Sequence, residues 1–455
     1  MSNLCVSHKW RGSAYFRLRE MKLYSTNNPE FTVDFKEAVF NSMPQDKGLY
    51  MPDTIRPLDE EFLNNIEMCS LEQIAFKVAN HILDGAIPAD DLKAIVTEAI
   101  NFPAPVIKLD EDTYVLELFH GPSLAFKDFG ARFMSRVMSY FMEEGEKTLN
   151  VLVATSGDTG GAVALGFLGV ENTQVTILYP KGKVSHIQEL QLTTNGHNIR
   201  AVEVDGTFDD CQALVKQAFT DKDLNEKFRL TSANSINIAR LIPQTFYYFN
   251  AYAQLKRQGK TDIVFSVPSG NFGNIGAGLL AWKLGLPVKQ FIAATNINDT
   301  VPQFLETGVY TPKPSVATLS NAMDVGNPSN WVRIMNLFKE DAEALKEVVT
   351  AYSYDDEQTA DAVNVVFEDY QYVVCPHTAI AWMAIGQYRY DSRDNLSTAV
   401  FLSTAHPCKF PDVYQGAIKD SITIPDQVQD LLGKPKQAIE LSADFEVFKN
   451  YLLED

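Results

Sequence analysis

The sequence predicts an α/β fold in which parallel sheets are covered by helices on both faces. Three observations carry this prediction. Short apolar runs rich in β-forming residues alternate with helical stretches from about 106 to 415. Two of these runs end in glycine-rich turns that lead into helices. The chain has 455 residues, 45% of them hydrophobic and 21% charged, which suffices for the large core of two or three domains.

Residues 21–105 read as a small, mainly helical N-terminal region. The stretch NNPEFTVDFKEAVFNSM, 27–43, has apolar residues at helical spacing. A further helix has Ser70 and Gln73 as a capping box and ends at Gly85. Residues 1–20 are basic without an apolar segment, so we interpret them as an upstream start, with the natural chain opening at Met21; a basic presequence is the alternative.

The catalytic core is expected over 106–415, and 416–455 reads as a turn-rich tail that ends in a helix. Buried strands between helical segments favour parallel pairing. The predicted strands are TYVLEL (113–118), NVLVAT (150–155), QVTILYP (174–180), IRAVEVD (199–205), IVFSVP (263–268), QFIAAT (290–295) and TAVFLST (398–404).

The formal net charge of −19 argues against nucleic acid or an anionic membrane as a partner. No apolar run approaches the roughly 20 residues of a membrane span. The histidines form no metal-binding motif, so no metal is expected. The cysteines are scattered without a CxxC pair, which indicates a reducing compartment, the cytoplasm, and no disulfides. They are Cys5, Cys69, Cys211, Cys375 and Cys408.

One lysine has unusual neighbours. In HGPSLAFKDFG, Lys127 follows Ala125 and Phe126, and Phe129 comes shortly after it. A lysine in an apolar pocket loses solvation, so the pKa of its amine falls and the amine becomes nucleophilic. The alternative is a partly exposed lysine at a helix start, with its stem packed on Phe126.

Two strand–turn–helix units carry glycines where a helix begins. TSGDTGG, 155–161, and SGNFGNIGAG, 269–278, each place backbone N–H groups at a helix N-terminus, where an anion binds. Tight turns with no ligand are the alternative for either unit. Neither turn matches a P-loop, and neither is followed by the acidic residue of a dinucleotide fold.

Together, these parts have a chemical meaning. One lysine, one turn for a phosphate and one turn for a carboxylate are what a pyridoxal 5′-phosphate enzyme requires, because the lysine forms a Schiff base while the turns hold the cofactor phosphate and the amino-acid carboxylate.

In these motifs the sequence resembles the threonine synthase family. Its members are fold-type-II pyridoxal phosphate enzymes that hold the cofactor between two α/β lobes. The resemblance runs from about Tyr24 to Phe410. The family converts O-phospho-L-homoserine and water to L-threonine and phosphate. The motifs that carry it are YSTNN, FKEAVFNSMPQDKGLYMP, HGPSLAFKDFG, ATSGDTGGAVA, YPKGKVSHIQELQLTT, NSINIARLIPQ, VPSGNFGNIGAG, PHTAIAW and LSTAHPCKF.

The resemblance implies a role for each motif. Lys127 is the catalytic Schiff-base lysine, Thr404 faces the pyridine nitrogen, and Asp158 lies near the cofactor's 3′-oxygen, where related enzymes carry Asn. The cofactor phosphate loop is Ser269, Gly270, Asn271, Phe272, Gly273 and Asn274. The substrate-carboxylate loop is Thr155, Ser156, Gly157, Thr159 and Gly160.

The substrate brings a second phosphate, which leaves during the reaction. Its predicted ligands lie in the two motifs KGKVS and NSINIAR, and they are Lys183, Ser185, Gln188, Asn237 and Arg240. A solvated loop for KGK and a helix start with an exposed arginine for NSINIAR are the alternatives. His406 and Thr378 either line the site or are structural.

The chain departs from the family pattern at two places. Cys375 stands where the family usually has an acid, and Asn27 and Asn28 follow Ser25 and Thr26 where it usually has arginine and glycine. Asn27 keeps open a phospho-lyase for another γ-phosphorylated amino alcohol. Two further alternatives are a serine or threonine dehydratase of the same fold and a catalytically silent amino-acid or cofactor-binding protein. As its assembly, a monomer or a homodimer is expected.

Overall fold

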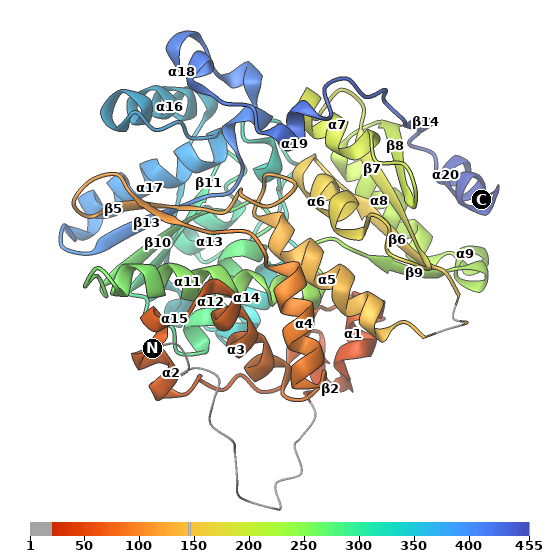
Figure 1. Cartoon of the computed structure of the whole chain (residues 1–455), viewed down its shortest axis with the longest axis horizontal. Helices are drawn as coiled ribbons and strands as arrows, with labels where there is room; N and C mark the ends of the chain where they lie inside the picture. Colours follow the sequence, from red (N-terminus) through yellow and green to blue (C-terminus); the bar gives the residue numbers. More distant parts are fainter. Residues whose placement is uncertain (1–20, 144, 146, 455) are drawn as a thin grey trace, which may run out of the picture.

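The computed structural model of the chain describes residues 21–143, 145 and 147–454. The expectations for residues 1–20, Cys5 included, lie outside this range. Two sheets organise the molecule, and Figure 1 shows the larger one with its helices on the left and the smaller one on the right. The predicted α/β fold of two parallel-sheet lobes is confirmed.

The larger sheet has six strands. Neighbouring strands run parallel except at one edge, where β4 and β5 are antiparallel. In spatial order they are β12 (Val349–Ser353), β11 (Gln290–Thr295), β10 (Ile263–Pro268), β13 (Thr398–Ser403), β5 (Thr113–Glu117) and β4 (Val106–Lys108). β10 and β13 are buried at every position, because helices cover both faces of the sheet.

The smaller sheet has five strands, all parallel. In spatial order they are β14 (Ile439–Ser442), β8 (Ile199–Asp205), β7 (Thr173–Pro180), β6 (Leu149–Ala154) and β9 (Arg229–Ser232). All seven predicted strands are present in one or other sheet. The short strands β4, β9, β12 and β14 were not predicted.

Helices connect and cover the strands, as the parallel pairing requires. In chain order, those of the two lobes are α5 (Lys127–Phe141), α6 (Asp158–Phe167), α7 (His186–Thr193), α8 (Phe208–Thr220), α9 (Lys222–Lys227), α10 (Ile238–Leu241), α11 (Gln244–Lys256), α12 (Gly273–Lys283), α13 (Thr300–Thr307), α14 (Trp331–Leu337), α15 (Ala342–Lys346), α16 (Asp356–Tyr370) and α17 (Pro376–Ser392).

The N-terminal region is mainly helical, as expected, but it also contains a small antiparallel sheet. Its helices are α1 (Phe35–Asn41), α2 (Glu60–Asn64), α3 (Leu71–Leu83) and α4 (Ala89–Ala99), and its strands are β1 (Leu23–Ser25), β2 (Asn28–Val33) and β3 (Tyr50–Pro52). The helical interpretation of residues 28–33 was therefore wrong. The predicted capping box at Ser70 and Gln73 is present at the start of α3.

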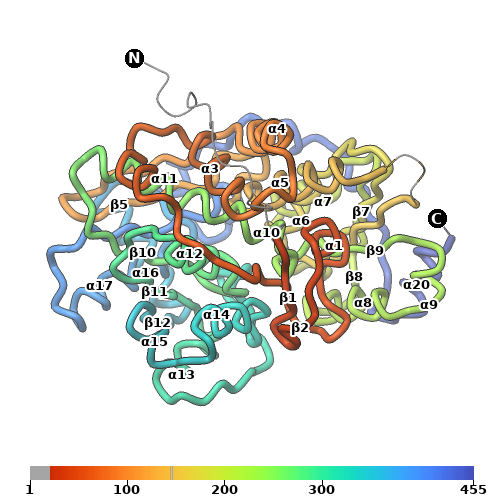
Figure 2. The backbone as a smooth tube through the Cα atoms, turned by 90° about the horizontal axis from the view of Figure 1, so that it is seen from below, coloured from red at the N-terminus to blue at the C-terminus, as the bar shows by residue number. Residues whose placement is uncertain are grey.

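The small sheet is anchored to the larger lobe. Figure 2 shows β1 and β2 beside α14, and the Tyr24 hydroxyl donates to Asn336 Oδ1 just there. The fully buried Arg333 donates from Nη2 to the carbonyl oxygen of Tyr50, at 3.2 Å, and to that of Ile236, at 2.6 Å. These hydrogen bonds join segments that are far apart in the sequence, so local sequence patterns could not predict that they stabilise β1–β3.

The segment after residue 415 is more than a tail. It forms α18 (Gly416–Ser421), α19 (Asp426–Gln429), strand β14 and helix α20 (Phe445–Glu454). β14 pairs with β8, and α20 buries Phe448 and Leu452 in the core beneath the smaller sheet. The final helix is confirmed, whereas the turn-rich interpretation missed the edge strand.

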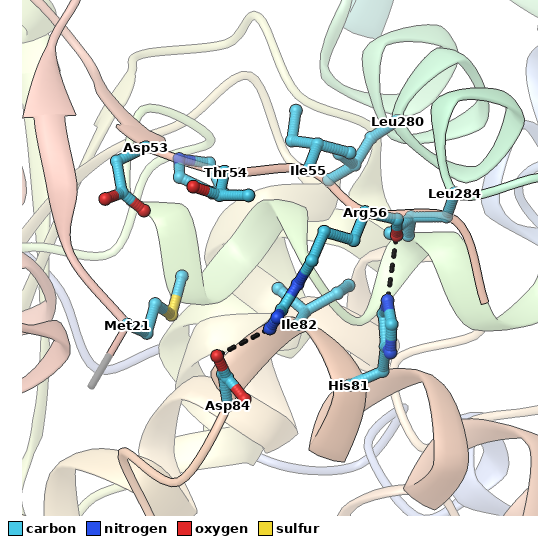
Figure 3. A pocket seen from close by; sticks show the side chains of 11 residues that line it. Met21, Asp53, Thr54, Ile55, Arg56, His81, Ile82, Asp84, Leu280 and Leu284 are labelled. Carbon is cyan, nitrogen blue, oxygen red and sulfur yellow. Dashed lines mark hydrogen bonds and ion pairs between the residues drawn. The ribbon is translucent and has the colours of Figure 1, made fainter. Parts of the chain in front are cut away.

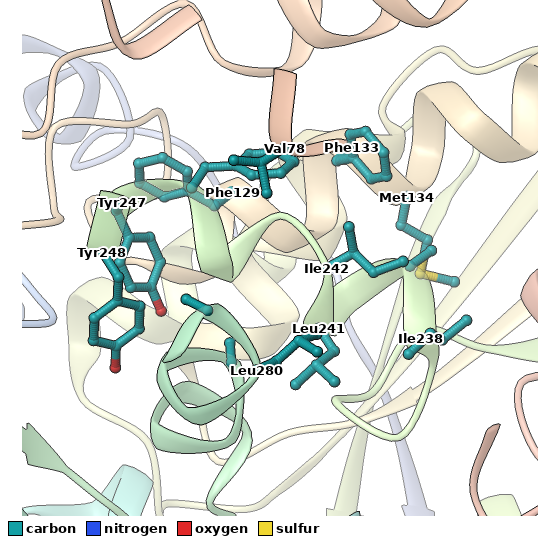
Figure 4. Packing of buried hydrophobic residues seen from close by; sticks show 14 of the residues in the cluster. Val78, Phe129, Phe133, Met134, Ile238, Leu241, Ile242, Tyr247, Tyr248 and Leu280 are labelled. Carbon is teal, nitrogen blue, oxygen red and sulfur yellow. The ribbon is translucent and has the colours of Figure 1, made fainter. Parts of the chain in front are cut away.

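The largest core cluster lies behind α5. Phe129 and Met134 of α5 pack among apolar side chains of α10 and α11, as Figure 4 shows, and the Phe129 ring meets Tyr247 edge-on at 5.1 Å. Tyr247 lies beside Tyr248, with ring centroids 5.0 Å apart. This packing fixes the start of α5, where Lys127 lies.

No described helix is long and apolar enough to cross a membrane. Cys211, Cys375 and Cys408 are buried free thiols, and Cys69 is also buried. Among the described residues, no cluster of histidine, cysteine or carboxylate side chains has the grouping of a metal site.

Candidate active site

Three loops meet at one edge of the larger sheet. Strands β10, β13 and β5 are neighbours and run parallel, so their carboxyl ends lie side by side. The loop after β5 leads to Lys127, the loop after β13 begins with Thr404, and the loop after β10 begins with Ser269. A backbone bond from Phe126 N to the Thr404 carbonyl oxygen, at 2.9 Å, joins the first two loops. The sheet therefore assembles three predicted motifs at one place.

Lys127 is the first residue of α5 and is partly exposed. Its ammonium lies 4.6 Å from the centroid of the Phe126 ring. Both sequence interpretations are thus partly realised: the lysine packs on Phe126, and it does so among buried charges. Burial lowers the pKa of Lys127 to about 8; Asp158 opposes this effect, and Arg240 and Lys409 add to it.

Asp158, at the start of α6, is buried and forms an ion pair. Its Oδ1 lies 2.7 Å from Nζ of Lys409 and accepts a bond of 3.0 Å from Nε2 of Gln188. Burial raises the pKa of Asp158, but the charge and hydrogen bond of Lys409, with the bond from Gln188, outweigh it and hold the pKa below its usual value. Asp158 is therefore a carboxylate whose charge acts on the Lys127 amine.

His377, in the first turn of α17, faces the same cluster. The N–H of Ala322 donates to its Nε2 at 3.2 Å, so the proton of a neutral ring lies on Nδ1, 3.8 Å from the Cys375 thiol. Burial, the repulsion of Lys127 and the repulsion of Lys409 lower the pKa of His377 to about 4, with Asp158 opposing them. His377 is neutral near neutral pH.

The loop after β6 differs from the sequence expectation in one respect. The Thr155 hydroxyl accepts bonds from the N–H groups of Gly157 and Gly160, at 2.9 and 2.8 Å. These two donors are occupied, where the glycine pattern had predicted them free for a ligand. Ser156 and Thr159 retain partial exposure on this loop. The hydroxyl of Thr155 thus orders the loop, and it leaves fewer N–H groups for a carboxylate than the spacing predicts.

The loop after β10 is held from both sides. A Cβ at Gly270 would lie 2.6 Å from Cα of Met323, so only glycine fits there. Phe272 adopts a left-handed φ of 58° and lets α12 begin at Gly273. The Asn271 amide donates to Ser235 Oγ at 2.9 Å. Ser269 donates from its hydroxyl to the carbonyl oxygen of Val267, at 2.8 Å. These contacts fix the shape of the loop.

Asn274 follows in the first turn of α12 and is oriented by two tyrosines. Tyr247 and Tyr248 donate from their hydroxyls to its Oδ1, at 2.6 and 2.7 Å. Its Nδ2 is buried and has no partner among the described residues. An amide with a fixed oxygen and an unsatisfied donor is suited to bind an acceptor oxygen.

The predicted ligands of the leaving phosphate are dispersed. Lys183 is exposed on the loop after β7, and Ser185 caps α7. Asn237 is committed to Val39 O, to Ser42 Oγ and to the cap of α10, which favours a structural role over phosphate contact. Gln188 is buried against Asp158.

Arg240 is buried rather than exposed, so the alternative of an exposed arginine is wrong. Its Nη1 donates to the carbonyl oxygen of Ala233, while its Nε is buried without a partner among the described residues. A Cβ at Gly130 would lie 2.7 Å from that Nε, so α5 packs directly on the guanidinium. Burial lowers the pKa of Arg240 to about 10, with Asp128 opposing the shift. It remains a cation at neutral pH.

Thr378 and His406 lie near the loop after β13. The Thr378 hydroxyl donates to Ser403 Oγ at 3.3 Å and lies 3.1 Å from the Cys375 sulfur. His406 accepts from the N–H of Cys408 through Nδ1 and meets the Phe119 ring edge-on. Both side chains have structural partners.

Sequence reasoning missed Lys409 and His377 as members of the site. Lys409 lies in LSTAHPCKF, and His377 in PHTAIAW, but no local pattern shows that either side chain folds toward Asp158. The one available signal was a lysine among apolar residues in Cys408–Phe410, the same signal that identified Lys127.

Two hollows lie away from this cluster. A cleft of about 770 Å³ separates α8 from the segment that includes Phe304, Tyr310 and Trp331. A cavity of about 100 Å³ lies under Met21, where Arg56 pairs with Asp84 and the Nε2 of His81 bonds to the Arg56 carbonyl oxygen, as Figure 3 shows. None of the predicted site residues lines either one.

The residues present fit pyridoxal phosphate. The Lys127 amine is partly exposed and has a lowered pKa, as a lysine that attacks an aldehyde requires. The unpaired Nδ2 of Asn274 and the close packing at Gly270 suit a phosphate on the loop after β10. Thr404 follows β13 at the same edge of the sheet. These residues would hold the cofactor between the two sheets.

Comparison with known proteins gives matches along almost the whole described chain. The family of pyridoxal-phosphate dependent enzymes matches residues 96–404. Two further families, the threonine synthase N terminus and the threonine synthase C-terminal region, match residues 22–100 and 378–452.

Individual relatives agree with this. Threonine synthase from Haemophilus influenzae is 44% identical over 95% of this chain and 100% of its own length. The crystal structure of threonine synthase from Escherichia coli covers 95% of this chain and 100% of its own at 43% identity, with a TM-score of 0.88.

A second solved structure contains the cofactor. The structure of PLP-bound threonine synthase from Brucella melitensis is 32% identical, covers 95% of this chain and 99% of its own, and has a TM-score of 0.86. The similarity therefore includes both lobes, the N-terminal region and the C-terminal segment. The chain belongs to the threonine synthase family of pyridoxal-phosphate-dependent enzymes.

Proposed function

We propose that this protein is a threonine synthase, a carbon–oxygen lyase that converts O-phospho-L-homoserine and water to L-threonine and phosphate in the last step of threonine biosynthesis. The observation that carries the proposal is the Lys127 amine. It lies at the start of α5 among buried charges, where the loops after β5, β10 and β13 meet at one edge of the larger sheet.

The cofactor site uses residues of three loops. Residues 269–274 hold the phosphate of pyridoxal phosphate, with the Nδ2 of Asn274 supplying the donor that Tyr247 and Tyr248 orient. Thr404, which follows β13, would face the pyridine nitrogen with its hydroxyl. A neutral hydroxyl leaves that nitrogen without a carboxylate partner, so the ring withdraws electrons less strongly than a protonated ring would.

When bound, pyridoxal phosphate supplies the electron sink for bond cleavage next to the substrate amine. The chain supplies the base. Nζ of Lys127 takes a proton from the substrate Cα, gives that proton up again, and then helps to remove a proton from Cβ. Each removal requires an amine that is neutral near the working pH. A pKa of about 8 meets that requirement.

The substrate carries two anionic groups. The loop at Thr155, Ser156, Gly157, Thr159 and Gly160 binds the carboxylate, with Ser156 and Thr159 as its exposed members. Arg240 and the exposed Lys183 supply positive charge for the leaving phosphate. With Lys127 neutral, the buried cluster holds two cations, Lys409 and Arg240, and two carboxylates, Asp158 and Asp128.

A dehydratase is the second candidate, because its chemistry uses the same lysine and cofactor. A threonine deaminase from Solanum lycopersicum shares this fold at 17% identity and a TM-score of 0.54, a likeness of fold alone. Such an enzyme needs no second phosphate site. A phospho-lyase with another γ-phosphorylated substrate differs only in the residues that contact the substrate chain.

The test measures phosphate and threonine released from O-phospho-L-homoserine. Equal amounts of both products support the proposal, and 2-oxobutyrate in place of threonine contradicts it. Lys127→Ala should abolish both products. Lys93→Ala, which changes an exposed lysine on α4, is the matched control and should leave the rate unchanged.

The colour of the protein tests the cofactor separately. A yellow protein whose colour borohydride fixes to Lys127 supports the lysine's role even if the substrate is another amino acid. Fixation at a different lysine would contradict the assignment of Lys127. A yellow, fixable protein with no activity on any amino acid would favour the silent binding protein.

The proposal also covers the compartment and the oligomeric state of the enzyme. We place it in the cytoplasm, since the cysteines are scattered along the sequence without a CxxC pair, and we expect a monomer or homodimer that binds no nucleic acid. Light scattering at micromolar concentration tests the assembly, and a larger oligomer would contradict it.

A further inference from the structure

Lys409 is a buried cation that the proposed reaction does not use. It lies in a short 3₁₀ turn, Pro407–Lys409, directly after the loop of Thr404. Its side chain is 0% exposed and that of Asp158 is 5% exposed, and the two are joined at 2.7 Å. A lysine is seldom buried so completely without a specific partner.

A second bond fixes its position. Nζ of Lys409 also donates to the carbonyl oxygen of Ser123, at 2.9 Å. The N–H of Ser123 in turn donates to Oδ2 of Asp128, at 2.9 Å. Lys409 is thereby tied both to α6, through Asp158, and to the loop that leads into α5. Its ammonium cannot leave without breaking both connections.

The charged and titratable groups around this pair come from three helices and from the turn of Lys409 itself, which adds His406 and Cys408. Lys127 and Asp128 belong to α5, Arg240 to α10, and Cys375 and His377 to α17 and its cap. Gln188 of α7 adds a neutral donor. His377 is neutral and Cys375 is a buried thiol whose pKa is raised, so neither can neutralise a carboxylate. The cations that act on this site are Lys127, Lys409 and Arg240.

We infer that Lys409 is the permanent counter-ion of Asp158 and, by holding that carboxylate, prevents it from capturing the Lys127 nitrogen as its ion-pair partner. Lys409 is on this view a positioning residue for the reaction. The inference rests on the proposed role of Lys127 as the cofactor lysine.

The physical reason is competition for one buried carboxylate. A buried carboxylate without a counter-ion is strongly destabilised, so Asp158 either pairs with a cation or takes up a proton. Asp158 already favours the protonated form of Lys127, while Lys409 disfavours it. If Lys409 were absent, an ionised Asp158 would favour positive charge on the Lys127 nitrogen without opposition from Lys409, and a protonated nitrogen is neither a nucleophile nor a base.

The experiment compares four variants of the holoenzyme: Lys409→Met, Asp158→Asn, the double variant and Lys449→Met. Lys449 also forms a paired ammonium, 2.9 Å from Asp221 and 2.6 Å from Asp223, but on α20, so it is the matched control. For each protein, the absorbance of the bound cofactor is followed against pH, which reports protonation at the nitrogen that Lys127 contributes. This measurement needs no substrate.

The inference predicts opposite shifts that cancel. Lys409→Met should raise the midpoint pH of the absorbance change by about 1–3 units, because an unpaired carboxylate now faces Lys127. Asp158→Asn should lower it, and the double variant should return close to the wild-type midpoint. Lys449→Met should leave it unchanged. A structural role alone would not produce shifts of opposite sign.

A folded Lys409→Met protein with an unchanged or lowered midpoint would overturn the inference. If the single variant does not fold, the double variant, which leaves no unpaired charge, decides. A double variant displaced as far as Asp158→Asn would contradict the inference, and one at the wild-type midpoint would support it. Borohydride fixation at a lysine other than Lys127 would instead refute the proposed lysine, so the two failures are distinguishable.

Discussion

In the cofactor-free protein, the amine of Lys127 should lower the free energy of unfolding. Burial disfavours its protonated form, and this form is the one that prevails in the unfolded chain up to a pKa of 10.5. The informative change is Lys127→Met, which keeps the length and apolar stem of the side chain and removes the ammonium. We expect the variant to be more stable than the wild type at neutral pH and inactive.

The magnitude follows from the pKa. A fall from 10.5 to about 8 corresponds to roughly 3 kcal/mol at about 1.4 kcal/mol per unit. Because the side chain is partly exposed, solvent screens part of this, and we expect about 1–3 kcal/mol. Below pH 8 both states bind the proton and the cost is at its maximum. Between the two pKa values the unfolded chain holds more protons, so the wild type gains stability as pH rises, and the advantage of the variant shrinks.

Urea unfolding of both cofactor-free proteins, at about pH 7 and about pH 10, measures this difference. Taking the difference between the two proteins cancels the other titrating groups. Lys93→Met, on the exposed face of α4, should match the wild type at both pH values. The reasoning would be refuted if Lys127→Met were less stable than the wild type at neutral pH, or if its advantage were the same at both pH values.

Three other variants test the local structure. In Gly157→Ala the new Cβ would lie 2.4 Å from Cδ of Gln188, and the residue would have to keep a φ of +130°. We expect this variant to lose about 1–3 kcal/mol of stability. An unchanged thermal midpoint would contradict this. Ser70→Ala removes the N-cap of α3 and should lower the free energy of unfolding by about 1 kcal/mol, with kcat unchanged. A changed kcat would argue against a purely structural cap. Tyr248→Phe deletes one of the two hydroxyl donors to Asn274 Oδ1 and should weaken the binding of pyridoxal phosphate about 5-fold. Equilibrium dialysis measures this affinity. A wild-type affinity would contradict the role of Tyr248 in orienting the Asn274 amide.

Much of the architecture could be predicted from local patterns. The buried strand at 263–268 reads directly from its continuous apolar run, and the cap at Ser70 from its spacing to Gln73. Lys127 was recognisable because a charged residue among apolar neighbours is costly unless it has a function. The glycine turns located the ends of two strands and the starts of two helices. Each of these signals depends on residues that are close in sequence, where propensity and periodicity act.

The tertiary structure decided what long-range contacts control. The pairing of β14 with β8 and of β1 with β3 joins segments whose own sequences favour no particular partner. The Thr155 hydroxyl occupies donors that the glycine pattern left to a ligand. Which residues form the site was likewise a matter of the fold.

The ion pair between Lys409 and Asp158 is the clearest example of this division. The sequence by itself determined which residue types were available, a lysine in one motif and an aspartate in another. Whether they meet depends on how the 3₁₀ turn after β13 packs against the start of α6. Their protonation depends on the dielectric surroundings that only packing creates, because burial and neighbouring charges set a pKa, and neither is encoded within a few residues of the group.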